Sequence, residues 1–370
     1  MATSDQKKFR LGVVGCGSIG PTHGAAALQI PDEAEVIATC DVIAERAKAT
    51  ALKFGVARVY SSFDQILADK DIDVVSICTP SGMHADMAVA AMEAGKHVIC
   101  EKPMEITLEA CDRMIDAEKR TGKKLTVISQ HRFDAATQLV KEAIMSGKLG
   151  KIILADAHVK WWRTQEYYDS GDWRGTWKWD GGGALMNQGV HTVDVLQYLV
   201  GGVDRLWAQT RTGAHKDIEV EDIAVAALSF TCGAVGTFTA TTAAYKGLPV
   251  RIDIYGTDGS AIIEGDRLKS MMLKNGQTVT SEEAAAHAVS VAQGGTASVK
   301  EQASHRPADA KQGATWGDAH RAQFQNFFNA IRTNTQPLID GLAARRPVEI
   351  VLSIYKSQRS GQAVDVKQAF

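Results

Sequence analysis

A glycine-rich loop near the start of the chain constrains the fold more than any other feature. The segment GCGSIG, residues 15–20, follows a short apolar run and opens an alanine-rich stretch, and Asp41 ends the next apolar run. In a G-x-G-x-x-G turn, the first glycine permits the tight turn, the second lets a pyrophosphate approach the backbone, and the third lets the helix pack closely. The helix N-terminus offers unpaired N–H groups to phosphates. We therefore expect a dinucleotide site that includes Gly15, Gly17, Ser18, Ile19, Gly20 and Asp41.

Asp41 also bears on which dinucleotide binds. A carboxylate at this place accepts hydrogen bonds from both hydroxyls of the adenosine ribose and repels a 2′-phosphate. The residues that follow it are Val42 and Ile43, and the first arginine, Arg46, comes five residues after Asp41. The sequence therefore favours NAD over NADP as the cofactor.

Apolar strand-like runs alternate with alanine-rich stretches through the first third of the chain. The alanine-rich stretches have helical length, and alanine is the best helix former. The expected strands are residues 11–14, 35–40, 74–78, 97–100 and 125–128, and the expected helices include 24–30, 44–54 and 85–94. Such alternation is typical of a parallel sheet covered on both faces. We predict an α/β Rossmann domain, with a doubly wound parallel sheet, over residues 1–129.

The rest of the chain, residues 130–370, is richer in β-structure. The expected strands are residues 151–160, 206–212, 223–230, 235–243 and 251–256, and the expected helices are 136–146, 189–199, 320–332 and 343–361. Glycine-containing turns separate several of these strands, which is typical of a mostly antiparallel sheet. We predict a second domain of the α+β class. Residues 282–315 contain few large apolar residues and are expected to form a mobile loop or a surface excursion.

Composition and charge exclude several classes of protein. The formal net charge is -2, so no basic excess exists to neutralise the phosphates of a nucleic acid. None of the six cysteines forms a C-x-x-C pair, and we expect no metal. The first ten residues have no apolar core of signal-peptide length, and no apolar run approaches the length of a membrane span. We expect a cytoplasmic protein without a membrane partner.

A second motif, Cys100-Glu101-Lys102-Pro103, stands at the end of the fourth expected strand. Further motifs are Cys78-Thr79-Pro80, His84, the run 92–98, the segment 181–191 (GGGALMNQGVH) and the closing helix 348–361. With these motifs the chain resembles the glucose–fructose oxidoreductase / inositol dehydrogenase / rhizopine-catabolism (Gfo/Idh/MocA) family over essentially its whole length. The resemblance implies a Rossmann domain followed by a substrate domain with a large open sheet, which packs against a neighbour in dimers or tetramers. It also implies substrates such as sugars, inositols, sugar acids, nucleotide sugars and glycosides.

The resemblance assigns roles to particular residues. The family's motif lysine corresponds to Lys102, which would hydrogen-bond the reacting oxygen, and its catalytic histidine to His191. Histidine titrates near neutrality, so His191 would take the hydroxyl proton in oxidation and return it in reduction. The family usually has an aspartate four residues before this histidine, where this chain has Asn187, which can bind a hydroxyl but cannot ionise. The cofactor is also expected to contact Thr79, Pro80, His84, Glu101 and Lys102.

A segment rich in tryptophan and tyrosine, residues 160–177, is expected to line the substrate site. Aromatic faces pack on the C–H faces of sugars, and arginine binds hydroxyls or carboxylates with two donors. The alternatives are that these aromatic side chains anchor the loop to the sheet or pack at an oligomer interface. Asp194, one turn after His191, is expected either to orient the His191 imidazole or to face solvent. The expected substrate contacts are Arg163, Tyr168, Trp173, Asn187, His191 and His131, and for His131 a hinge hydrogen bond is the alternative.

Three functions fit these observations. The first is an NAD-dependent dehydrogenase acting on a secondary hydroxyl of a sugar, glycoside, inositol or sugar acid. The second is a non-catalytic NAD-binding regulator of the same fold, against which the presence of both Lys102 and His191 argues. The third is a reductase of a non-sugar carbonyl compound, such as a dihydrodiol or a tetrapyrrole. The aromatic, arginine-containing segment favours the first.

Overall fold

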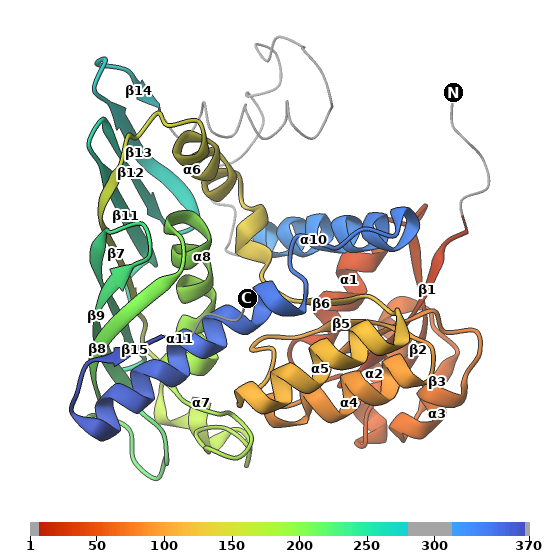
Figure 1. Ribbon diagram of the computed structural model, residues 1–370. Coiled ribbons are helices and arrows are strands. Elements are labelled where there is room, and N and C mark those ends of the chain that lie inside the picture. Colours follow the sequence, from red (N-terminus) through yellow and green to blue (C-terminus); the bar gives the residue numbers. More distant parts are fainter. Residues whose placement is uncertain (1–6, 280–312, 367–370) are drawn as a thin grey trace, which may run out of the picture. The chain divides into compact units, whose positions relative to one another are not determined.

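The computed structural model describes residues 7–279 and 313–366 (Figure 1). The chain forms two compact units, each with its own sheet. The first unit comprises Met1–Gln130, Lys178–Gly181 and Ala314–Val348, and the second comprises His131–Trp177, Gly182–Gly313 and Glu349–Phe370. The boundary predicted from the sequence, between residues 129 and 130, lies one residue before the point at which the chain first passes into the second unit. The prediction did not include the later segments 178–181 and 314–348, which belong to the first unit.

A six-stranded parallel sheet forms the centre of the first unit, in the order β3-β2-β1-β4-β5-β6. Its strands are β1 (Phe9–Val14), β2 (Ala34–Cys40), β3 (Arg58–Tyr60), β4 (Val74–Ile77), β5 (His97–Cys100) and β6 (Leu125–Val127). This is the strand order of a doubly wound dinucleotide-binding fold, in which the ligand binds outside the carboxyl ends of the strands where the order reverses, here between β1 and β4. The predicted Rossmann domain is confirmed.

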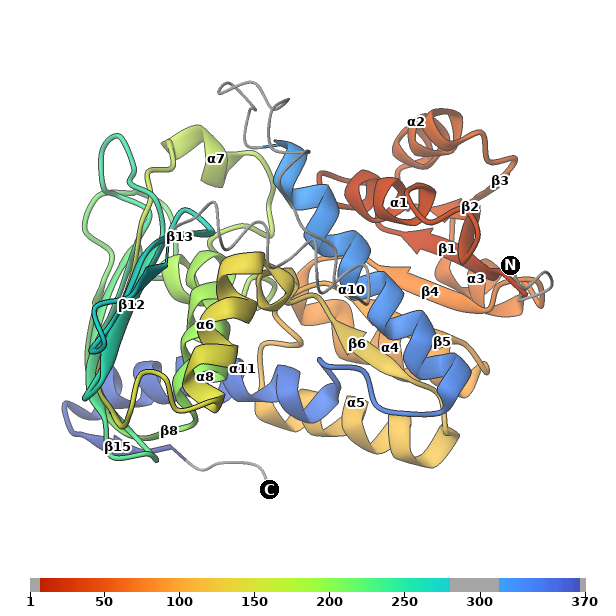
Figure 2. The ribbon, with the colours of Figure 1, turned by 90° about the horizontal axis from the view of Figure 1, so that it is seen from above.

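Helices cover both faces of this sheet, because its short strands are apolar on both sides. On one face, α1 (Gly20–Leu28) and α10 (Gly313–Thr333) share a core with the strands, in which Phe324 and Phe328 of α10 pack with Leu11 and Val74 (Figure 2). On the opposite face lie α4 (His84–Glu93) and α5 (Leu108–Thr121), which pack against each other (Figure 1). The remaining helices of this unit are α2 (Ala44–Phe54) and α3 (Phe63–Ala68).

A nine-stranded sheet forms the second unit, in the order β14-β13-β12-β11-β7-β10-β9-β8-β15. Every neighbouring pair is antiparallel except β7 and β10, which run parallel. The strands are β7 (Ile152–Lys160), β8 (Val203–Arg211), β9 (Ile223–Phe230), β10 (Val235–Thr241), β11 (Arg251–Gly256), β12 (Gly259–Glu264), β13 (Arg267–Leu273), β14 (Thr278–Val279) and β15 (Val364–Asp365). The predicted large, mostly antiparallel sheet is confirmed.

One face of the nine-stranded sheet is covered by helices. These are α6 (Ala135–Met145), α8 (Val190–Val200) and the C-terminal half of α11 (Gly341–Ser360) (Figure 1). The Ser357 hydroxyl of α11 accepts a hydrogen bond of 3.0 Å from the Ala208 N–H in β8. Along β8 and β9 buried and exposed residues alternate, and the other face carries exposed apolar side chains, among them Trp207, Val225 and Val235.

The structure differs from the sequence-based expectations in several elements. The patterns did not indicate β3, β12, β13, β14, β15, α3, α5 or α7 (Gln165–Asp169). Several of these are shorter than the runs in which periodicity is visible. The predicted loop 282–315 is wrong at its end, because α10 begins at Gly313, while residues 282–312 lie outside the described part of the chain. Among the described helices, none is both long and apolar enough to cross a membrane.

Candidate active site

The glycine loop joins β1 to α1 at the carboxyl end of the parallel sheet. Gly15 has φ +86°, and a Cβ atom there would lie 2.5 Å from the carbonyl oxygen of Cys78, the residue that follows β4. A Cβ atom at Gly20 would lie 2.2 Å from the Gly15 carbonyl oxygen, so this glycine permits the close start of α1. At Gly17 a Cβ atom would meet nothing within 4 Å, so the backbone is open there to a ligand. The three glycines thus have the properties that a pyrophosphate site requires.

Asp41 follows β2 and is held beside the glycine loop. Its Oδ2 accepts a hydrogen bond of 2.8 Å from the Cys16 N–H, and its Oδ1 accepts one of 2.8 Å from the Ile43 N–H. The side chain is buried, whereas the next residue, Val42, is 88% exposed. Each carboxylate oxygen has a second lone pair, so Asp41 can still accept from a ribose diol. The two hydrogen bonds from backbone N–H groups fix the direction in which Asp41 would accept hydrogen bonds from the ribose.

His84 connects the loops that follow β4 and β5. Its Nδ1 lies 2.9 Å from the Pro103 carbonyl oxygen, and its Nε2 lies 3.0 Å from the Thr79 carbonyl oxygen. Burial lowers the pKa of this imidazole, and a neutral ring can donate only one of these two bonds at a time. The peptide bond between Lys102 and Pro103 is cis. His84 therefore aligns the Thr79-Pro80 turn with the Glu-Lys-Pro motif, and its own contact with a cofactor stays a prediction.

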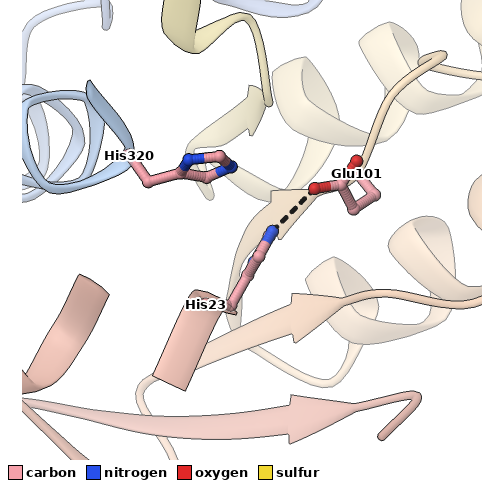
Figure 3. A group of neighbouring side chains, drawn as sticks. All are labelled: His23, Glu101 and His320. Atoms are coloured by element: carbon pink, nitrogen blue, oxygen red, sulfur yellow. Dashed lines mark hydrogen bonds and ion pairs between the residues drawn. The ribbon is translucent and has the colours of Figure 1, made fainter. Parts of the chain in front are cut away.

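Glu101 forms a buried cluster with His23 of α1 and His320 of α10 (Figure 3). The Glu101 Oε1 lies 2.8 Å from the His23 Nε2, and its Oε2 accepts a hydrogen bond of 3.0 Å from the Lys102 N–H. His23 Nδ1 lies 2.6 Å from the Ser76 hydroxyl in β4. The ligand atoms of the three clustered side chains lie within 4.8 Å of one another, so among the described residues of the first unit this group could hold a metal ion. Sequence reasoning did not find His23 or His320.

In the second unit, Asn187 and His191 lie on either side of a change of helix type. Asn187 is in a π-helical turn, Ala184–Gly189, and His191 is in the first turn of α8. The carboxylate of Glu221 holds the start of the π-helical turn, because it accepts hydrogen bonds from the Gly183 N–H at 3.1 Å and the Leu185 N–H at 2.8 Å. Burial raises the pKa of Glu221 to about 7. π-Helical turns are frequent at functional sites.

His191 contacts the ring of His131, and two carboxylates lie beside His131. The ring of His131 lies edge-on to the ring of His191, with 5.2 Å between the centroids. His131 Nδ1 lies 2.7 Å from an Asp134 carboxylate oxygen and 3.4 Å from Asp266. Burial opposes protonation of His131, but the hydrogen bond and charge of Asp134, together with the charges of Asp266 and Asp194, outweigh burial and raise the pKa of His131 to about 9. His131 is therefore an imidazolium at neutral pH. His131, Asp134 and Asp266 form the second group of described residues that could hold a metal ion.

Asp194 does not face solvent, so that expectation was wrong, and its orientation of the His191 imidazole stays a prediction. It is buried and forms an ion pair with Arg132, whose Nε donates to its Oδ2 at 2.8 Å. The Arg132 guanidinium also lies over the Tyr198 ring, 4.8 Å from the centroid. The pair therefore ties the 3₁₀ turn Gln130–Phe133 to α8.

The tryptophan-rich segment contributes a polar cluster around Gln188. The Gln188 Oε1 accepts a hydrogen bond of 2.9 Å from Arg163 Nη2, and its amide nitrogen donates to Tyr167 Oη at 2.9 Å and to Asn187 Oδ1. Arg174 donates to the same Tyr167 oxygen at 2.7 Å. Gln188 thus links Arg163 to Asn187, and the contact of these two residues with a substrate stays a prediction. Tyr167 and Gln188 were missed, although Gln188 directly follows the motif residue Asn187.

Tyr168 is another of the expected substrate contacts. It is buried, and its hydroxyl lies 2.8 Å from the Thr242 hydroxyl. Its ring packs on His215, with 4.7 Å between centroids. Trp173 lies beside the cluster, with the Arg174 guanidinium over its ring at 4.4 Å. The aromatic segment therefore both anchors itself to the sheet, through Tyr168, and presents polar groups, through Arg163 and Tyr167.

Comparisons with known proteins agree on one family. A family model described as oxidoreductase family, NAD-binding Rossmann fold, matches residues 9–129, and the model of the GFO/IDH/MocA C-terminal domain matches residues 137–262. Myo-inositol 2-dehydrogenase of Thermotoga maritima is 29% identical over 275 residues, which cover 73% of this chain and 79% of that protein. Levoglucosan dehydrogenase of Pseudarthrobacter phenanthrenivorans is 30% identical over 292 residues, which cover 70% and 75%.

A solved structure matches the chain over nearly its whole length. It is the WlbA dehydrogenase from Bordetella pertussis in complex with NADH and UDP-GlcNAcA, and the TM-score is 0.85 at 34% sequence identity. The match covers 98% of this chain and 99% of that one.

Proposed function

Because the chain belongs to the Gfo/Idh/MocA oxidoreductase family and contains its NAD-binding Rossmann domain, we propose that it is an NAD-dependent dehydrogenase of a sugar-like alcohol. The substrate class is a sugar, glycoside, inositol or sugar acid that carries a secondary hydroxyl group. One observation carries the proposal: the chain has both Lys102, directly after the buried Glu101, and His191, at the start of α8. A regulator that only binds NAD has no need of an acid–base pair.

The first unit fits NAD in its described geometry. The open backbone at Gly17 suits a pyrophosphate, and the fixed Asp41 carboxylate suits a ribose diol. NAD, when bound, accepts the hydride from the substrate carbon or returns it. The chain's own residues must then hold the substrate and move the hydroxyl proton.

We assign transfer of the hydroxyl proton to His191 and stabilisation of the reacting oxygen to Lys102. In oxidation, the O–H bond of the substrate breaks, its proton passes to the neutral His191 imidazole, and its electron pair forms the carbonyl as the hydride leaves carbon. Lys102 donates a hydrogen bond to the same oxygen and stabilises the negative charge that develops on it. Reduction runs through the same residues in reverse, with His191 as the acid.

Arg163, Asn187, Trp173 and His131 are proposed to contact the substrate. Arg163 and Asn187 are joined through Gln188, so one amide side chain holds both in place. Tyr168 is committed to Thr242, and its predicted contact with the substrate is untested. The relatives include a myo-inositol 2-dehydrogenase and a levoglucosan dehydrogenase, which supports a polyhydroxylated substrate. We propose that the nine-stranded sheet, with its exposed apolar side chains, forms the interface of a homodimer or homotetramer.

A panel of alcohols tests the proposed function. The purified protein, incubated with NAD, should reduce it to NADH in the presence of at least one sugar, glycoside, inositol, sugar acid or nucleotide-sugar acid. Oxidation of dihydrodiols alone with NAD, or reduction of tetrapyrrole carbonyls alone with NADH, would move the substrate class. Tight NAD binding without turnover on any of these compounds would favour the regulator and overturn the proposal.

NAD should be preferred over NADP. A repulsion of about 1.4 kcal/mol between Asp41 and a 2′-phosphate lowers the affinity for NADP about tenfold. Like charges in contact readily reach that value. We expect kcat/KM with NAD to exceed that with NADP by at least this factor. Asp41→Asn removes the charge at nearly constant shape and should move the ratio toward NADP. A wild-type preference for NADP would contradict the assignment of Asp41.

Asn187→Asp should change the pH dependence of catalysis without much change in packing. A carboxylate near His191 favours the imidazolium and raises its pKa, typically by about one unit or more at close range. Because His191 must be neutral to accept the proton, the acid limb of the kcat/KM profile for oxidation should move to higher pH. Asn187→Ala is the control for loss of the side chain and should not move this limb upward. An unchanged profile in Asn187→Asp would show that position 187 does not act on His191.

A further inference from the structure

A continuous chain of hydrogen bonds runs inside the first unit from β4 to the backbone of Lys102. It passes from the Ser76 hydroxyl to His23 Nδ1, from His23 Nε2 to Glu101 Oε1 (Figure 3), and from Glu101 Oε2 to the Lys102 N–H. His23 is fully buried, and the Glu101 side chain is 7% exposed. The glycine loop, through α1, is thus linked to the motif lysine by side chains that no part of the proposed proton transfer uses.

A buried ion pair is weak evidence for stability, because the cost of removing two charges from water can exceed their mutual attraction. Apolar side chains of similar volume would fill the same space beside Phe324 of α10, which contacts the His23 ring edge-on at 5.6 Å. The cluster lies at the carboxyl end of β5, directly before Lys102. Its position points to a role in placing that residue.

We infer that His23 is a positioning residue for Lys102, which acts by holding the Glu101 carboxylate in the one orientation that accepts the Lys102 N–H. The inference rests on the proposed function only for the role of Lys102 in catalysis. The geometry of the cluster does not depend on that function. A carboxylate with rotational freedom about its last bond would exchange its two oxygens and its partners. His23 Nε2, as a donor to one oxygen, fixes the other oxygen on the Lys102 amide.

The charges around His23 are consistent with an imidazolium. Burial alone would lower its pKa, but the neighbouring Cys78 and then Glu101 outweigh burial and raise the pKa of His23 to about 10. The pKa of Glu101 is lowered, because His23, Lys102 and His320 favour the carboxylate against the effect of burial. The pair is therefore charged through the neutral range, and Glu101 remains an acceptor for the Lys102 amide.

A metal ion held by His23, Glu101 and His320 is the competing explanation of this cluster. Both ring nitrogens of His23 already have hydrogen-bond partners, and the 2.8 Å between Nε2 and Oε1 is a hydrogen-bond distance. A metal would need one of these nitrogens without its proton. The contacts therefore favour the ion pair, and metal content is part of the test.

Two substitutions at position 23 and one control test the inference through activity. His23→Leu removes the donor to Glu101, and His23→Gln restores an N–H donor close to the place of Nε2. A misplacement of about 1 Å can cost about 10²-fold, so kcat should fall by about this factor in His23→Leu and recover largely in His23→Gln, with NAD affinity nearly unchanged. The control, His97→Leu, removes a histidine at the other end of β5 that accepts from the Lys124 N–H. Equal losses in His97→Leu and His23→Leu would overturn the inference.

Nuclear magnetic resonance gives a readout that does not need turnover. After reductive ¹³C-methylation of the lysines, the Lys102 signal, assigned by its absence in Lys102→Ala, should shift in His23→Leu and stay in place in His97→Leu. The ¹⁵N signals of His23 should show that Nε2 carries a proton. An unmoved Lys102 signal, a His23 Nε2 without a proton, or stoichiometric metal in the purified protein would each overturn the inference. If the Lys102 signal moves but no alcohol is oxidised by the wild type, the proposed function fails and the positioning role stands.

Discussion

Alanine in place of Lys102 or His191 is expected to lower kcat by about 10²–10⁴-fold, the usual contribution of a general acid or base. Without His191, the hydroxyl proton has no positioned acceptor, and without Lys102 the developing oxyanion loses its charged donor. Neither change touches the glycine loop or Asp41, so both variants should still bind NAD. Steady-state kinetics with the best alcohol of the panel, together with NADH-binding fluorescence, measures the two effects separately.

Two control variants test whether the loss of activity is specific to Lys102 and His191. Lys148→Ala removes an exposed lysine just after α6, and His158→Ala removes a histidine from β7. Both should retain kcat close to the wild-type value. The role of Lys102 or of His191 would be withdrawn if its alanine variant matched its control. Loss of NAD binding in Lys102→Ala would instead place that residue in the cofactor site alone.

The Rossmann part of the structure could be predicted because its signals are local. The glycines at positions 15, 17 and 20 and the acid at position 41 have fixed spacings, and each apolar run of the parallel sheet is bounded by turns. Helix α2 has the bounds that its alanine-rich sequence indicated. Strands such as β3, with three residues, and β15, with two, carry too few side chains to show a period.

Contacts between distant residues could not be predicted in the same way. Arg132 and Asp194 are 62 positions apart, and neither sequence neighbourhood indicates the other. His23 lies in an alanine-rich helix, where a single histidine is not part of any periodic pattern that would predict its role. Its partner, Glu101, is 78 residues away. The apolar stripe of α10 shows that it packs on a sheet but not that this is the sheet of the first unit. The candidate site is therefore predicted from motifs, whereas the contacts around its residues are seen only in the structure.

Arg132→Leu is expected to be the most destabilising substitution of a charged residue in the second unit, at about 3–5 kcal/mol. Arg132 and Asp194 are 4% and 2% exposed, so loss of the guanidinium leaves a buried carboxylate without its main partner. Part of the loss comes from the Tyr198 ring, which the guanidinium covers. Urea denaturation followed by tryptophan fluorescence measures the effect, since Trp207 reports on the second unit from β8.

The double variant Arg132→Leu/Asp194→Leu distinguishes two causes of destabilisation: the cost of a buried unpaired charge and the loss of attraction between the two residues. Leucines of similar volume remove both charges, and apolar replacement of a buried ion pair is often neutral or stabilising. The double variant should therefore be more stable than either single variant, and destabilisation equal to the sum of the two would contradict the pair as described. Its activity answers a second question, because Asp194 lies one turn after His191, and Arg132 directly follows His131, whose ring contacts His191. If the double variant folds like the wild type but oxidises the substrate poorly, the ion pair serves to orient His191 and its surroundings rather than to stabilise the fold.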